Sequence, residues 1–163
     1  MKRIAQIALL LTVAASMQMP AATIGLSFSS NIVSAGGTFT LAVRVTNLAG
    51  DSLVDFGMNP FISDPSKVAF LGATVDAALN DDSGFFGGNP AIAGDAFPPI
   101  DTAPITLATL TFRALLPGTA NVGVSSDLAD PNQGLFLLGA VQDLSSAAAV
   151  SIVMSRRQPG GPV

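Results

Sequence analysis

Residues 107–127 read LATLTFRALLPGTANVGVSSD, and this stretch decides the fold class of the chain. On both sides of Pro117-Gly118, apolar and polar side chains alternate, which is the period of a β-strand with one buried face. Proline followed by glycine fits the second and third positions of a tight turn. The stretch therefore predicts a pair of strands that bury one face and expose threonine, arginine and serine on the other.

The same alternation recurs along most of the chain, and residues 38–46, TFTLAVRVT, are its most regular example. About eight to ten strands, many of about 5–6 residues, are expected. Sheets with one apolar and one wet face must pack face to face, so the sequence predicts an all-β sandwich. Further strands are expected at 24–28, 54–58, 68–75, 135–141 and 150–154, and loops at 80–99 and 127–134.

Composition excludes several function classes. The 163 residues are 49% hydrophobic and 11% charged, and they include no His, Cys, Trp, Tyr or Glu. Without cysteine the chain can form no disulfide, thiolate zinc site or thiol nucleophile. A net charge of −4 leaves no basic surface that could neutralise phosphates, so nucleic acid is excluded as a partner.

The first residues have the layout of an export signal. Two basic residues precede an apolar run over 4–15 that is too short to span a bilayer, as in a cleaved secretory signal peptide. We expect a signal peptide over 1–22, cleaved after Ser16 or at its last residue, a domain over 23–155 and a flexible tail over 156–163. The mature protein is then secreted or held at the cell surface, and it contains no later run of transmembrane length.

Three stretches combine a turn with an alternating strand: VSAGGTFTLAVRVTN at 33–47, SDPSKVAFLGATV at 63–75 and LATLTFRALLPGT at 107–119. In this order they resemble the cohesin-like family of secreted bacterial modules. The resemblance implies a jelly-roll β-sandwich akin to carbohydrate-binding modules. It also implies a docking role, because members of the family hold dockerin modules of polysaccharide-degrading enzymes on a scaffold. It assigns no contact residue to this chain.

Few residues could carry catalysis. With no His, Cys or Glu, an acid–base or nucleophilic site would need paired aspartates or a Ser-Lys pair. Asp81-Asp82 in the predicted loop and Ser66-Lys67 in the SDPSK turn are expected to be solvated turn residues. The protein is therefore predicted not to be an enzyme.

Oxygen-bearing side chains gather in SDLADPNQG, residues 126–134. Asp127, Asp130 and Asn132 have the loose spacing of calcium ligands, without the strict alternation and final glutamate of a calcium-binding helix–loop–helix. A calcium site here is the alternative to a plain polar turn, and no other cofactor is expected.

Several binding classes remain open. Phe85 and Phe86 in GFFGG could present their rings to a polysaccharide, or tuck over the end of the sandwich. The tuck is favoured because exposed apolar patches are uncommon without a partner. The polar faces of strands 38–46 and 107–114 could instead dock a dockerin-like module. The sequence predicts a non-catalytic extracellular binding or adhesion module, with a carbohydrate-binding module or a self-assembling structural protein of the cell surface as alternatives.

Overall fold

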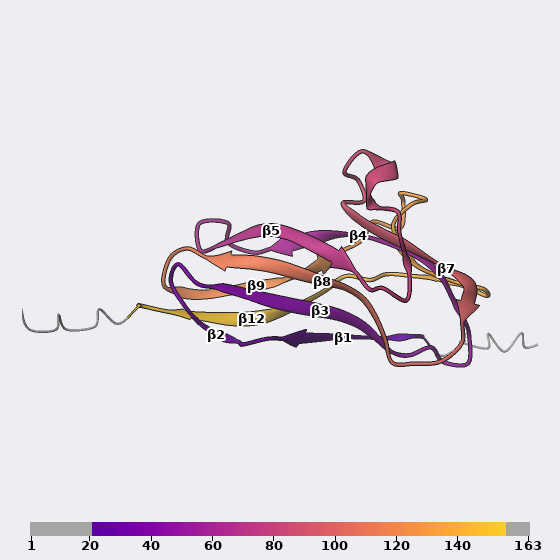
Figure 1. The fold of residues 1–163 in the computed structure, drawn as a ribbon, viewed down its shortest axis with the longest axis horizontal. Coiled ribbons are helices and arrows are strands. Elements are labelled where there is room, and N and C mark those ends of the chain that lie inside the picture. The colour runs from indigo at the N-terminus through magenta and orange to yellow at the C-terminus, as the bar shows by residue number, and fades with distance from the viewer. Residues whose placement is uncertain (1–20, 156–163) are drawn as a thin grey trace, which may run out of the picture.

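The computed structural model of the protein describes residues 21–155, which form two β-sheets packed face to face without an α-helix (Figure 1). From β3 to β9 the long strands alternate between the two sheets, which is the crossing pattern of a jelly roll. The predicted all-β sandwich is confirmed. The smaller sheet has the order β1-β3-β8-β5, with bounds Thr23–Phe28, Thr38–Asn47, Ile105–Ala114 and Val68–Val75.

The larger sheet contains the remaining strands, and β2 and β12 form its parallel pair. The described residues form twelve strands rather than the eight to ten that the sequence predicts, because several strands of this sheet are short. Its members are β2 (Ile32–Ser34), β4 (Leu53–Ile62), β6 (Asn80–Asp81), β7 (Ile92–Ile100), β9 (Gly118–Ser125), β10 (Gly134–Leu137), β11 (Val141–Gln142) and β12 (Ser146–Val153).

Strands β9 and β10 line the same edge of β4, one after the other. β12 pairs with β9, and β11 pairs with β10. Only four residue steps separate Gln142 from Ser146, at most about 14 Å of chain. That is too short to cross four interstrand spacings of about 4.8 Å each. β9 and β10 therefore continue one another along one edge of β4, and residues 126–133 form a loop between them. β7 pairs with the other edge of β4.

The core lies between the sheets and follows the period-2 pattern. Leu41, Val43 and Val45 on β3 are fully buried. The Phe112 ring lies between Phe39 and Phe70, with centroid distances of 5.4 and 5.7 Å. Burying each such side chain stabilises the fold by roughly 1.5–3 kcal/mol.

The stretch 107–127 forms two strands, but these strands do not pair with each other. β8 lies between β3 and β5, whereas β9 lies between β4 and β12. Both strands bury one face in the same core, so the Pro-Gly corner carries the chain from one sheet to the other.

The loop predicted over residues 80–99 is wrong, because β6 and β7 form there. Pro98, Pro99 and Gly94 hid the alternation of β7 in the sequence. A Cβ at Gly94 would lie 2.6 Å from the Asn80 carbonyl oxygen, so the close approach of β6 requires glycine. The continuous strand predicted over 135–141 is instead a hairpin of β10 and β11.

The predicted tail, 156–163, lies outside the described residues, and so does the predicted signal peptide apart from Ala21 and Ala22. Ala22 is buried, and its carbonyl oxygen accepts a 2.7 Å hydrogen bond from the Gln142 side chain. Within residues 21–155, no helix has the length and apolarity needed to cross a membrane.

Candidate docking face

The outer face of the larger sheet is defined by alternation on β4 and β7. Phe56 and Ala96 point into the core, so Asp55 and Asp95, which pair across the two strands, point outward. Gly57 and Asn59 continue the outward side of β4. This face, together with the loops 82–91 and 126–133 beside it, is called the docking face below.

Loop 126–133 lies directly against β4. A Cβ at Gly57 would lie 1.9 Å from the Asn132 carbonyl oxygen and 3.0 Å from the Pro90 ring. Only glycine permits such an approach of backbone to backbone. Figure 1 shows this loop and the one that carries the 3₁₀ helix η1 (Ser83–Phe86) projecting side by side from the sandwich.

The Gln133 side chain fixes the two loops on β4. It is 5% exposed. Its Nε2 donates to Asn89 Oδ1 at 2.9 Å and to Asp130 Oδ2 at 3.0 Å. Its Oε1 accepts from Asn59 Nδ2 at 3.2 Å and from the Asp127 amide at 3.0 Å. A glutamine amide offers two N–H donors and two acceptor lone pairs, so all of its hydrogen-bonding capacity is used.

Asn59 and Asn89 complete the same network. Asn59 Oδ1 accepts from the Ala91 amide at 2.9 Å, and Asn59 Nδ2 donates to Asn89 Oδ1 at 2.9 Å. Asn89 Nδ2 donates in turn to Asp130 Oδ2 at 3.2 Å. Side-chain hydrogen bonds thus hold both loops against strand β4.

Carboxyl groups cluster at the β6 and β7 side of this face. Partial burial raises the pKa of Asp55, and the charges of Asp82 and Asp95 raise it further. Desolvation, a hydrogen bond to Asp95 and the charges of Asp95 and Asp81 raise the pKa of Asp82. Asn80 Nδ2 donates to Asp95 Oδ2 at 3.2 Å. The cluster is a site of uncompensated negative charge.

Aromatic rings stand out of the face around this cluster. Phe85 is 82% exposed and Phe97 is 89% exposed, whereas Phe86 is half-buried. The expected tuck of both GFFGG rings is therefore wrong for Phe85, because the short helix η1 turns its ring away from the sandwich. Phe97 lies on β7, within the stretch 80–99 that the sequence predicts to be a loop.

The calcium candidates lie in loop 126–133, where their oxygens accept hydrogen bonds from N–H groups. Asp127 Oδ1 accepts from the Ala129 amide at 2.9 Å, and Asp130 Oδ1 accepts from the Asn132 amide at 2.9 Å. Hydrogen bonds from the Asn132 amide and the Gln133 side chain lower the pKa of Asp130. Within residues 21–155 no three acidic side chains are grouped to hold a metal ion, and calcium binding stays a prediction.

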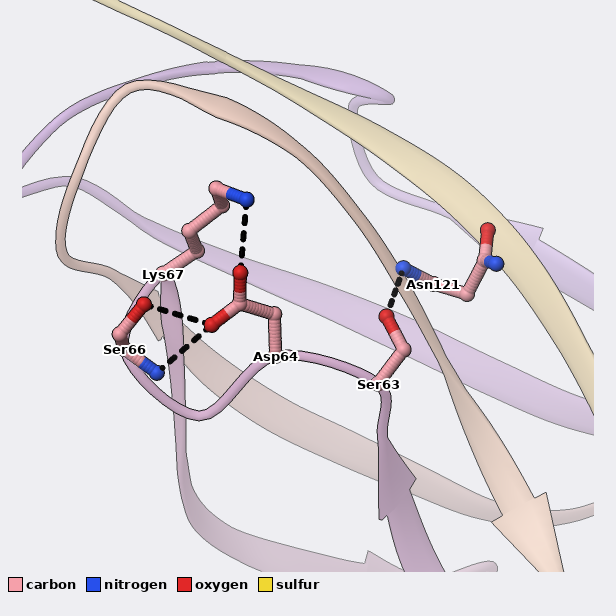
Figure 2. Close-up of polar contacts among 5 residues, drawn as sticks. All are labelled: Ser63, Asp64, Ser66, Lys67 and Asn121. Carbon is pink, nitrogen blue, oxygen red and sulfur yellow. Dashed lines mark hydrogen bonds and ion pairs between the residues drawn. The ribbon is translucent and has the colours of Figure 1, made fainter.

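The SDPSK turn between β4 and β5 does not form a Ser-Lys catalytic pair (Figure 2). Lys67 Nζ and Ser66 Oγ each contact a different oxygen of Asp64 at 2.6 Å. These two hydrogen bonds lower the pKa of Asp64 to about 2. The lysine therefore neutralises a turn carboxylate. Ser63 Oγ accepts from the Asn121 amide at 2.9 Å and ties the turn to β9.

Sequence reasoning missed the residues that build this face, among them Asn59, Asn89 and Gln133. A lone amide in a polar loop carries no recognisable pattern. The available signal was Gly57, a glycine within an otherwise alternating strand, which marks a close backbone approach.

The fold is that of cohesin modules. The structure is similar, with a TM-score of 0.59, to a cohesin module from a family 33 glycoside hydrolase of Clostridium perfringens, at 10% identity over 83% of this chain and 100% of that one. A type I cohesin of Pseudobacteroides cellulosolvens scores 0.52 at 11% identity, covering 86% of this chain and 98% of that chain.

A cohesin–dockerin complex of Clostridium thermocellum contributes a further match, with a TM-score of 0.51 at 13% identity over 83% of this chain and 98% of that chain. The resemblance inferred from the three sequence stretches is thereby supported at the level of the fold. No protein-family model matches the chain, and no curated protein matches it in sequence.

Proposed function

We propose that this protein is a non-catalytic docking module that binds a dockerin-like protein through the docking face. The cohesin fold supports a docking role, since one similar structure is a cohesin in complex with a dockerin. We choose this face because the Gln133 network holds two projecting loops rigidly around the exposed rings of Phe85 and Phe97. Preorganised loops lose little entropy on binding, and buried aromatic anchors dominate interface energies.

The proposed module acts outside the cytoplasm, secreted or at the cell surface, as the export-signal layout of the first residues indicates. A dockerin-like partner would link it to polysaccharide degradation. The absence of His, Cys and Glu and the pairing of Lys67 with Asp64 support a role without catalysis.

Capture on the immobilised protein tests the proposal. Secreted proteins of the source organism are passed over the wild type, a Phe97→Ser variant and a matched Leu116→Ser variant. Leu116 is also exposed but lies at the β8–β9 corner. We expect a captured protein with a dockerin module, released by a calcium chelator, retained by Leu116→Ser and lost by Phe97→Ser. Equal capture by both variants would place the contact elsewhere.

Polysaccharide binding is the second candidate function, favoured by the exposure of the Phe85 ring beside Phe86 and the carboxylates. Aromatic rings flanked by hydrogen-bonding groups are the usual form of sugar platform. Affinity electrophoresis in gels containing soluble polysaccharides should then show retardation that Phe85→Ala with Phe86→Ala abolishes. Unchanged mobility of both proteins would rule this function out.

A further inference from the structure

The charges of the strands are segregated between the two sheets. Every charged residue on a strand of the larger sheet is acidic: Asp55, Asp81 and Asp95. Every charged residue on a strand of the smaller sheet is basic: Arg44 and Arg113. The strands of the two sheets therefore carry charges of opposite sign.

The two arginines lie on the outer face of the smaller sheet, called the threonine face because threonines surround them. Val43 and Val45 flank Arg44 and are buried, so the Arg44 side chain points outward and is exposed. The same alternation exposes Arg113. Their partners across the sheet on the threonine face are Thr106 for Arg44 and Thr38 for Arg113.

Neither arginine is neutralised within the described part of the chain, where the ion pair present joins Lys67 and Asp64. Arg44 Nε instead donates to Thr106 Oγ1 at 3.1 Å, which orients its guanidinium group on the sheet surface. A guanidinium group held in place with free N–H donors is suited to binding carboxylates.

The aspartates of the docking face carry uncompensated negative charge. Burial and the charges of Asp82 and Asp95 raise the pKa of Asp55, and burial and the neighbouring Asp95 and Asp81 raise the pKa of Asp82. No basic residue lies on any strand of their sheet. An external cationic group would relieve this repulsion. The threonine face supplies such groups in the exposed Arg44 and Arg113.

We propose that a second copy of this chain binds to the docking face, with Arg44 or Arg113 of its threonine face meeting the aspartates. The inference rests on charge complementarity between two surfaces of the same molecule and does not require a dockerin-like partner. In a pair of copies, one docking face and one threonine face remain free, so the contact is heterologous and does not close on itself. Copies therefore add in an open chain, and a bound partner protein would compete with this addition.

Sedimentation velocity of the full chain tests the proposal through its salt dependence. Charges on separate molecules interact over ~30 Å at 0.01 M salt and only ~3 Å at 1 M salt. We expect the average sedimentation coefficient to rise with protein concentration at low salt and to return to that of the monomer at high salt. A monomer at all concentrations in low salt would overturn the proposal.

Charge reversal identifies the surfaces. Asp82→Lys with Asp95→Lys, and separately Arg44→Asp with Arg113→Asp, should each weaken self-association by more than about tenfold, because like charges then face each other. Asp76→Lys with Asp101→Lys is the matched control. It changes the net charge as the first variant does, in the connections that follow β5 and β7, and should retain the salt-dependent association.

Mixing the two reversed proteins distinguishes a lost contact from a lost fold. The first variant gains cations on its docking face and the second gains carboxylates on its threonine face, so an equimolar mixture should associate although each alone does not. Failure of the mixture to associate would contradict the proposal. Capture of a dockerin-like protein is measured separately, so either idea can fail without the other.

Discussion

The outer faces of the two sheets are built by different means. On the smaller sheet, β3 and β8 pair without a register shift from Thr38 to Val43, and threonine faces threonine at Thr40 and Thr111. On the larger sheet, β4 is covered by a loop that leaves no room for a side chain at Gly57, and a buried glutamine holds that loop. Backbone periodicity therefore specifies the threonine face, whereas a few side-chain contacts specify the docking face.

Both faces rest on the same core, so a substitution that damages the core should affect both of them. Phe112→Ala leaves a cavity between Phe39 and Phe70 and should lower the free energy of unfolding by about 3–5 kcal/mol. Chemical denaturation measures this loss. The exposed ring at Phe85 is the matched control, and Phe85→Ala should change stability by less than about 0.5 kcal/mol.

A methyl group at Gly57 should damage the docking face alone. Gly57→Ala forces the Asn132 backbone away from β4 and should cost about 1–3 kcal/mol, as overpacking does. Amide chemical shifts should change in loop 126–133 and remain constant on β3. Gly84→Ala is the control, because a Cβ there meets nothing within 4 Å. Equal effects of the two substitutions would mean that the loop does not rest on β4.

Loss of the Gln133 amide should loosen the loops while the sandwich stays folded. Gln133→Leu leaves the Asp127 amide and the Asn59 side chain without their partner, and about 1 kcal/mol of stability should be lost. Hydrogen exchange of the Asp127 and Ala91 amides should accelerate. Thr40→Val on the threonine face should leave the exchange of both amides unchanged, and acceleration by both substitutions would remove the distinction between the faces.

Neutralising Asp55 should have the smallest effect, and it should be stabilising. The folded-state pKa of Asp55 is raised, so ionisation at neutral pH costs stability, and this cost disappears as the pH falls through the raised pKa. Asp55→Asn should therefore raise the thermal midpoint at neutral pH. It should leave the midpoint unchanged below about pH 3.9, where the wild-type carboxyl is protonated too. A gain that persists in acid would have another cause.

Alternation predicted the sandwich because burial of one strand face is encoded residue by residue. The pattern of β3 and β8 is visible without any knowledge of their neighbours. Pairing was harder to predict: the Pro-Gly corner at 117–118 looks like a hairpin, but it joins two sheets. Local turn chemistry does not specify which strands become neighbours.

The docking face was largely hidden from sequence reasoning. Gly94 and the prolines of β7 concealed a strand, and Gln133 gained its role only when loops distant in sequence came together. The candidates Phe85 and Asp130 were placed in loops, as they are, but nothing in their spacing shows that Asn89 and Gln133 connect those loops.

Amide chemical-shift perturbation by the captured partner would show which face of the protein the partner binds. The account predicts perturbation at Phe85, Asp95, Phe97 and the loop amides of Ala91 and Asp127, with Thr40 and Thr111 unaffected. Perturbation concentrated at Thr40 and Thr111 would contradict it, because the partner would then bind the regular threonine face.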